Sequence, residues 1–240
     1  MHYYKRIKKP GRYFREQLSK PKESSKEFFN ILKKLKLTNF NTLDLACGNG
    51  SNLMYLKKKF DNKKYCLGLD FNKGVLKSGK QVNTYENLDL KYGNILNLKD
   101  SYVNKFQLIT SFQTLSWLED YEKASIQMIK LKPKYISLSS LFWKGLIDFK
   151  IKLNFLKNNS YQRNIKYFDY FNIYSLNNFL DFFKVNKYES IYCKKFEIKK
   201  ELPNNFKRNM GTYTMKSKKK NIQISGPLIM NWYFIIFKRK

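Results

Sequence analysis

LDLACGNGSN, residues 43–52, is the densest run of small residues in the chain. A short apolar run, Thr42–Leu45, leads into it, and Ser51–Phe60 follows with apolar residues at helical spacing. We therefore predict a strand, a glycine turn and a helix. Glycines allow a backbone to approach a ligand closely, and the free N–H groups at the start of a helix favour a polar ligand. The turn is thus a candidate ligand-binding site.

A second carboxylate supports a nucleotide-like ligand at this turn. Residues 65–69 are predicted as the next strand, which ends in Asp70, twenty residues beyond Gly50. In nucleotide-binding α/β folds a carboxylate in this position accepts hydrogen bonds from ribose hydroxyls. Two ligand classes fit the pattern so far, namely dinucleotides and S-adenosylmethionine.

The glycine spacing and the position of Asp44 favour S-adenosylmethionine. The dinucleotide pattern G-x-G-x-x-G, counted from Gly48, requires a glycine at position 53, where this chain has Leu53. Asp44 lies inside the turn region. A carboxylate there would repel a pyrophosphate, but it can pair with the amino end of a methionine moiety, directly or through water.

The rest of the chain alternates between strand-like and helix-like segments. Strands separated by helices indicate a parallel sheet that is covered on both faces. The strands predicted at 190–198 and 231–238 are expected to form a closing hairpin. We predict further strands at 89–92, 106–110, 135–139, 190–198 and 231–238, and helices near 25–35, 73–80, 121–131 and 175–183.

These residues resemble the motifs of class I S-adenosylmethionine-dependent methyltransferases. Residues 44–50, DLACGNG, are similar to the first motif of that family, D/E-x-G-x-G-x-G, with Ala46 in place of the first glycine. Asp70 matches the acidic residue after the second strand, residues 93–95 match the segment beside adenine, and residues 106–117 match the fourth-strand motif. The resemblance covers residues 40–142. It implies a Rossmann-like, seven-stranded, mostly parallel sheet with helices on both faces and a C-terminal antiparallel hairpin.

The resemblance also implies which residues bind S-adenosyl-L-methionine. Two alternatives stay open: the segment at 94 and 95 is only a turn, and the phenylalanine at 112 belongs to the core rather than to the cofactor cleft. The candidate cofactor residues are Asp44, Ala46, Cys47, Gly48, Asn49, Gly50, Asp70, Phe71, Asn94, Ile95 and Phe112.

The C-terminal third resembles bacterial methyltransferases associated with surface-glycan biosynthesis. The similar segments are YFNIYS at 170–175, MGTYT at 210–214 and SGPLIMNWYF at 225–234. This likeness implies a small-molecule acceptor, an oxygen of a sugar, nucleotide sugar or glycan precursor. The alternative is that these side chains only fill the closing sheet. The candidate substrate-binding residues are Tyr170, Tyr174, Thr212 and Tyr213.

The length of 240 residues fits a single methyltransferase domain, 1–240. Within it we expect an N-terminal helical lid region at 1–40, an insertion or cover segment at 142–173, and a substrate-side loop at 202–226. The only histidine is His2, so an imidazole base is not expected and the catalytic residue stays unassigned.

Three widely separated cysteines without a CxxC pair suggest neither a disulfide framework nor a metal site. We expect a reducing, cytoplasmic location. The chain also lacks a run of about 18 apolar residues, so no membrane span is expected. The sequence leaves the oligomeric state open.

The chain is strongly basic, with 48 Lys and Arg against 18 Asp and Glu and a net charge of +30. Such a field attracts phosphates, nucleic acid or an anionic membrane surface. The alternative is compositional drift, because lysine, asparagine and aromatic residues abound as in proteins from AT-rich genomes. We expect a small-molecule acceptor. The basic surface is compatible with a phosphorylated acceptor but does not specify one.

Two other functions are left open by the sequence. An RNA methyltransferase would use the basic surface and stack bases on aromatic side chains. The chain lacks an NPPY-type motif after the fourth strand and has Ser111–Thr114 instead, which disfavours methylation of exocyclic base amines. The other alternative is a non-catalytic protein that keeps the cofactor fold as a scaffold.

Overall fold

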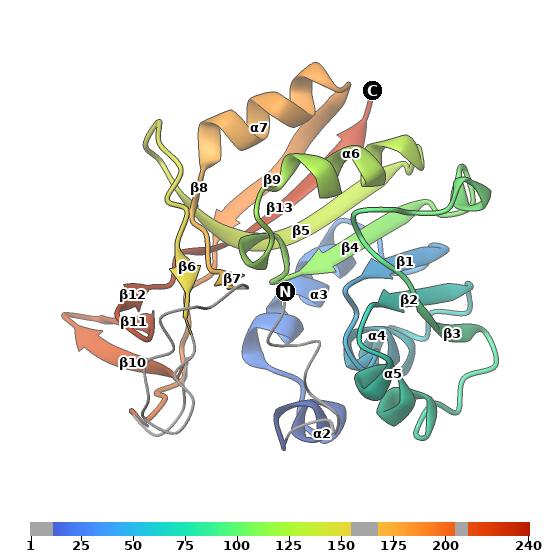
Figure 1. The fold of residues 1–240 in the computed structure, drawn as a ribbon. Coiled ribbons are helices and arrows are strands. Elements are labelled where there is room, and N and C mark those ends of the chain that lie inside the picture. Colours follow the sequence, from blue (N-terminus) through green and yellow to red (C-terminus); the bar gives the residue numbers. More distant parts are fainter. Residues whose placement is uncertain (1–11, 155–167, 205–210) are drawn as a thin grey trace.

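The computed structural model describes residues 12–154, 168–204 and 211–240. At its centre lies a sheet in which seven strands follow the order β3-β2-β1-β4-β5-β13-β9, with the short β8 paired to β5 (Figure 1). These strands are β1 (Thr42–Leu45), β2 (Cys66–Asp70), β3 (Leu88–Tyr92), β4 (Leu108–Phe112), β5 (Tyr135–Trp143), β8 (Tyr174–Ser175), β9 (Tyr188–Lys195) and β13 (Trp232–Arg239).

Five neighbouring strands, β3-β2-β1-β4-β5, run parallel, and β13 runs antiparallel between β5 and β9. All residues of β1 and β2 are buried, as expected for parallel strands covered on both faces. The expected Rossmann-like α/β fold is thereby confirmed. The two late strands pair as predicted, but residues 196–231 join them, so the connection is much longer than a hairpin turn.

Helices cover both faces of the sheet. Apolar side chains of α3, α4 and α5 pack on one face, and those of α6 and α7 pack on the other. The first helix, α2, lies against α4. The helices are α2 (Arg12–Ser19), α3 (Glu23–Lys34), α4 (Ser51–Phe60), α5 (Lys73–Lys80), α6 (Glu122–Lys130) and α7 (Leu176–Val185), with short 3-10 helices η1 (Asp100–Tyr102) and η2 (Leu115–Trp117).

The segment 142–173 leaves the sheet at the end of β5 and returns to it at β8. Its described parts form β6 (Lys152–Leu153) paired with β7 (Asp169–Tyr170), and Phe149 bridges to Ile173. The return strand β8 aligns Tyr174 with Phe142 of β5. The segment is therefore an excursion from the carboxyl end of β5.

Asn172 fastens this excursion to the loop that follows β4. The side chain is fully buried. Its Oδ1 accepts a hydrogen bond from the Ile151 N–H at 2.9 Å, and its Nδ2 donates to the Leu118 carbonyl at 2.8 Å. The Asn172 N–H donates to the Ser116 carbonyl at 2.7 Å. One amide thus satisfies backbone groups from two segments distant in the sequence.

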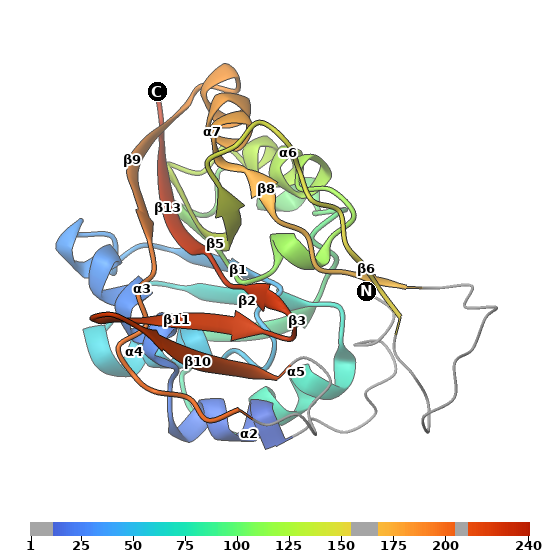
Figure 2. The ribbon, with the colours of Figure 1, turned by 90° about the vertical axis from the view of Figure 1, so that its left-hand side faces the viewer.

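The segment 202–226 was expected to be a loop, and this expectation is wrong. Residues Thr212–Ser217 form β10 and Lys220–Ser225 form β11, an antiparallel ribbon that β12 (Leu228–Ile229) extends (Figure 2). Apolar residues alternate with polar ones along both strands, which is a strand pattern. The abundance of lysine and asparagine concealed it. In Figure 1 the ribbon lies on the opposite side of the molecule from β3.

Among the described residues, no helix combines the length and the apolar character that crossing a bilayer requires.

Replacing Asn172 by alanine should destabilise the protein by about 2–4 kcal/mol, because buried backbone groups lose their partners. Urea unfolding followed by circular dichroism measures this change. Asn177→Ala, at an exposed position of α7, is the control and should change the unfolding free energy by less than about 0.5 kcal/mol. Equal effects of the two variants would show that the Asn172 network does not hold the excursion.

Candidate functional site

The glycine turn joins β1 to α4 at the carboxyl edge of the sheet. Three of its residues have left-handed backbone angles: Ala46 with φ 56°, Gly48 with φ 60° and Gly50 with φ 76°. This conformation costs a residue with a side chain about 1–2 kcal/mol, so Ala46 carries strain that a glycine would not. The Cys47 N–H donates to the Leu69 carbonyl at 3.0 Å, which fixes the turn to the end of β2.

The small size of Gly50 is explained by packing inside the protein. A Cβ at Gly50 would lie 2.5 Å from Leu90 Cδ2. Gly79 of α5, which the sequence analysis did not select, has the same role, because its Cβ would clash with the backbone carbonyl of Asn49. The turn therefore lies between β3 and α5, and glycine on both sides allows this close approach.

Asp70, at the end of β2, holds the turn from the other side. Its carboxylate accepts hydrogen bonds from the Gly48 N–H and the Asn72 N–H, both at 2.8 Å. Only 7% of the residue is exposed. Burial raises the pKa of Asp70, while these backbone N–H groups act in the opposite direction. A carboxylate fixed in this way is preorganised, and each oxygen keeps a further lone pair for a ligand.

Asp44 lies deeper, in the middle of the sheet. Its Oδ1 accepts a hydrogen bond from Thr110 Oγ1 of β4 at 2.7 Å, whereas its buried Oδ2 has no partner among the described residues. Burial, and then the charge of Asp70, raise the pKa of Asp44 to about 7. Thr110 was not anticipated, because the contact depends on the pairing of β1 with β4. A buried acceptor without a donor fits a ligand that brings a cationic or N–H group.

The other candidate residues of the turn support its shape. Asn49 is buried, and its Oδ1 accepts from the Ser51 N–H at 3.2 Å, at the start of α4. The Cys47 thiol is buried, and burial raises its pKa well above the ordinary value. Phe71 is half-buried directly after Asp70. Ser51 also donates to Gln17 Oε1 of α2 at 3.3 Å, so the N-terminal region reaches the turn.

Asn94 and Ile95, expected beside the cofactor, lie in a turn after β3, and their contact with the cofactor stays a prediction. The exposed Asn94 directs its Oδ1 to the Leu96 N–H of its own turn at 3.0 Å. Ile95 is buried in the core that α6 and α7 cover. Their backbone follows β3 at the same edge of the sheet as Asp70.

Phe112, at the end of β4, belongs to an aromatic cluster. Its ring lies 5.3 Å from that of Phe28 of α3 and 6.3 Å from that of Phe234 of β13. The residue is only half-buried. Phe112 therefore packs against the core, and its contact with the cofactor stays a prediction.

The four candidate acceptor residues separate into different environments. Tyr174 is fully buried, and its hydroxyl donates to the Leu115 and Leu118 carbonyls at 3.1 and 3.2 Å. The expected substrate contact of Tyr174 is therefore wrong, because ring and hydroxyl are both committed to the interior. Tyr170 of β7 is half-buried, and Thr212 and Tyr213 of β10 are partly exposed, so their proposed contacts stay predictions.

Two features of the site define the ligand that it fits. The Asp70 carboxylate, held by the Gly48 N–H, presents acceptor oxygens at the end of β2, and the unpartnered Asp44 oxygen lies in the interior. Hydroxyl groups on one part of a ligand and a cationic group on another would satisfy them. Among the described residues, no group of three His, Cys, Asp or Glu side chains comes close enough to hold a metal ion.

Gly79→Ala should destabilise the protein by about 1–3 kcal/mol, because the added methyl group meets the Asn49 carbonyl. In an unconstrained helix the same substitution stabilises by about 1 kcal/mol, so the sign of the change tests the packing. Urea unfolding measures it. Lys77→Ala, at an exposed position of the same helix, should leave the unfolding free energy nearly unchanged. A stabilising Gly79→Ala would contradict the described contact.

Asp44 should make the protein less stable as the pH rises. The unfolded chain loses this proton near pH 4, whereas the native protein keeps it up to about pH 7. Relative to high pH, the contribution of protonated Asp44 to the free energy of unfolding is therefore fully present below pH 4. It decreases as the pH rises from 4 toward 7. Asp44→Asn should remove this part of the pH dependence when unfolding free energies at pH 5 and 7.5 are compared. If the unfolding free energy of Asp44→Asn fell as steeply between pH 5 and pH 7.5 as that of the wild type, a buried, protonated Asp44 would be contradicted. Asp70, whose pKa is also raised, contributes a remaining slope of the same sign.

Comparison with known proteins agrees with this fold. A family model described as a methyltransferase domain matches residues 36–226. A search of curated proteins finds no match. Among solved structures, a protein from Listeria monocytogenes described as an S-adenosylmethionine-dependent methyltransferase is 13% identical, with a TM-score of 0.61, and the alignment covers 91% of this chain and 100% of that one.

Two further structures share the fold. Magnesium protoporphyrin IX methyltransferase from Synechocystis PCC 6803, solved with bound SAH, is 11% identical, with a TM-score of 0.54 and coverage of 91% and 83%. A protein from Pyrococcus horikoshii described as an RNA methyltransferase is 10% identical, with a TM-score of 0.57 and coverage of 99% and 96%. The family match extends over most of the sequence. It places the chain in the methyltransferase-domain family, as a class I S-adenosylmethionine-dependent methyltransferase.

Proposed function

We propose that this methyltransferase acts on a small acceptor, at an oxygen of a sugar, nucleotide sugar or glycan precursor. The observation that carries the proposal is the excursion 142–173, which Asn172 fastens to the loop after β4, next to the carboxyl ends of β4 and β5. A fixed cover at this edge favours an enclosed small molecule over an extended polymer. The likeness of the C-terminal segments to glycan-associated methyltransferases supports the acceptor class.

The residues of the glycine turn would hold the cofactor. Asp70 would accept hydrogen bonds from the ribose hydroxyls, and the unpartnered oxygen of Asp44 would face the ammonium end, directly or through water. The Gly48 turn would lie against the same part of the cofactor, with Phe71 and Phe112 at its sides. The bound cofactor supplies an electrophilic methyl group on a sulfonium.

The contribution of the chain to the reaction is mainly orientation. An acceptor held in line with the breaking bond gains much of its acceleration from positioning alone. Tyr170 is a candidate for this task, because burial and then the charge of Glu119 raise its pKa. Its hydroxyl stays protonated at neutral pH and would not take a proton from the acceptor. Because this proton is engaged with Glu119, Tyr170 would position the acceptor through its hydroxyl oxygen.

Calorimetry with S-adenosylhomocysteine tests the cofactor site. Asp70→Ala should weaken binding about 10- to 100-fold, because it removes hydrogen bonds to a charged acceptor. Gly48→Val should abolish binding, because a branched side chain disfavours the left-handed backbone at φ 60°. Asp89→Ala is the control, since Asp89 pairs with Lys91 on the neighbouring strand β3.

Unchanged binding in both turn variants would show that the site is misplaced. Absence of binding to the wild type would favour a non-catalytic scaffold.

The acceptor is identified by incubating the enzyme with labelled cofactor and a panel of nucleotide sugars, glycan precursors and RNA, followed by mass spectrometry. The net charge of +30 and the RNA methyltransferase neighbour support RNA as the second candidate. Label on RNA alone would overturn the small-acceptor proposal.

A further inference from the structure

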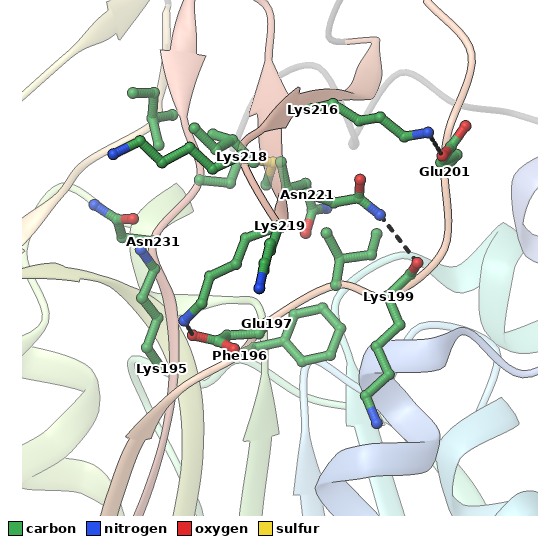
Figure 3. Close-up of a pocket in the computed structure, with 16 residues that line it drawn as sticks. Lys195, Phe196, Glu197, Lys199, Glu201, Lys216, Lys218, Lys219, Asn221 and Asn231 are labelled. Atoms are coloured by element: carbon green, nitrogen blue, oxygen red, sulfur yellow. Dashed lines mark hydrogen bonds and ion pairs between the residues drawn. The ribbon is translucent and has the colours of Figure 1, made fainter.

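The ribbon β10–β11 and the segment that follows β9 line a pocket of about 500 Å³, separate from the glycine turn (Figure 3). Residues 195–201 form one wall, and the turn at Lys218 and Lys219 forms the other. The volume lies within the range of sites that bind small molecules. None of the residues assigned to the cofactor turn contributes to this pocket.

The charge of the pocket is unbalanced. Six lysines and two glutamates line it, which gives a formal charge of +4. Lys220 pairs with Glu197 at 2.7 Å and Lys216 with Glu201 at 2.8 Å. The other four amines have no carboxylate partner among the described residues. They are Lys195, Lys199, Lys218 and Lys219.

Two of the four unpaired amines occupy opposite walls. Lys195 ends β9 and Lys219 lies in the turn between β10 and β11. Figure 3 shows Lys195 rising beside Asn231 and Lys199 extending away from the centre, and the amine that reaches Glu197 is that of Lys220. Amines from separate segments of one pocket repel each other, and Glu197, which is already paired with Lys220, offsets only part of this repulsion. A phosphate group between them would reverse the sign of this interaction.

The remainder of the lining is apolar and uncharged. Phe196, Ile198 and Met230 are buried beneath the lysines. Asn231 also lines the pocket, and its buried Oδ1 has no hydrogen-bond partner among the described residues. The pocket thus combines cationic groups with an apolar floor, which suits a phosphorylated compound that carries a ring.

The pocket opens at the edge of the sheet that also carries the glycine turn. β13 begins at Trp232, opposite Leu141 near the carboxyl end of β5, and β9 ends at Lys195, opposite Tyr233. β13 lies three strands from β1, or about 14 Å at the usual spacing of neighbouring strands.

Aromatic rings connect the two sites along this edge. The Phe196 ring lies 5.5 Å from that of Phe234, and Phe234 in turn contacts Phe112 at the end of β4. A pocket wall and a candidate cofactor residue are therefore two ring contacts apart. Because Phe196 and Phe234 are buried, an elongated acceptor with one end in the pocket would reach the cofactor by passing over these rings at the surface of this edge.

We propose that the lysine pocket binds the phosphate groups of the methyl acceptor, a phosphorylated small molecule such as a sugar or nucleoside diphosphate. The identification of the ligand as the acceptor rests on the proposed function, whereas phosphate binding stands on the pocket alone. An extended nucleic acid suits the pocket less well, because it requires a continuous cationic groove along its backbone. The paired glutamates interrupt the cationic lining here.

The test is calorimetric titration of inorganic pyrophosphate and of UDP into the full chain saturated with S-adenosylhomocysteine, which keeps the cofactor site blocked. Both probes should bind the wild type. The double variant Lys195→Ala, Lys219→Ala should weaken both at least about tenfold, because it removes two hydrogen bonds to charged groups. It should leave the affinity for S-adenosylhomocysteine unchanged within about twofold.

A matched control carries the same loss of charge elsewhere. Lys77→Ala, Lys184→Ala changes exposed lysines of α5 and α7 and should retain pyrophosphate binding within about twofold at equal salt. Equal weakening by both double variants would show a general surface effect and overturn the proposal. Absence of pyrophosphate and UDP binding to the wild type would overturn it as well.

RNA provides the last arm of the test. A single-stranded oligonucleotide that binds more tightly than UDP, and that both double variants weaken, would assign the charge to nucleic acid and overturn the small-ligand proposal. If pyrophosphate binds while S-adenosylhomocysteine does not bind to the untreated chain, the pocket is supported and the proposed function fails. The two conclusions are therefore distinguishable.

Discussion

The hydrogen bond from the Gly48 N–H to the Asp70 carboxylate, 2.8 Å long, joins the ends of β1 and β2 and fixes the candidate site. It closes a turn whose backbone is left-handed at three residues. Such a turn would be strained and mobile in isolation. A neighbouring backbone bond, from Cys47 to Leu69, and the close packing of α5 through Gly79 stabilise the same arrangement.

Asp44 shows what the site costs in stability. A carboxyl group with a pKa near 7 and an unpartnered oxygen in the middle of a sheet opposes folding. Thr110 compensates only part of this cost through one hydrogen bond. Natural proteins keep such unfavourable groups mainly where function needs them. The energetics of Asp44 therefore agree with its position in a cofactor motif, independently of the resemblance to other sequences.

Local patterns predicted most of the central sheet correctly. The β1–turn–α4 unit, Asp70 at the end of β2, and the long β13 are all recognisable from periodicity and small residues, because their signals lie within about ten residues of sequence. The ribbon β10–β11 was missed, since its lysine-rich composition concealed an alternating pattern. Tyr174 was misassigned for a different reason. A polar aromatic residue looks suited to a substrate, and only the carbonyls of distant loop residues show that its hydroxyl is already paired.

The sequence by itself determined the fold class, the glycine turn and the two carboxylates that are proposed to bind the cofactor. These features depend on neighbouring residues and on the periods of strands and helices. Only the tertiary structure decided that Gly50 and Gly79 are small for packing, that Asp44 is half-satisfied by Thr110, and that scattered lysines gather in one pocket. Each of these depends on strand order and on contacts between segments far apart in the chain. Such contacts form only when the sheet assembles, so no local pattern encodes them.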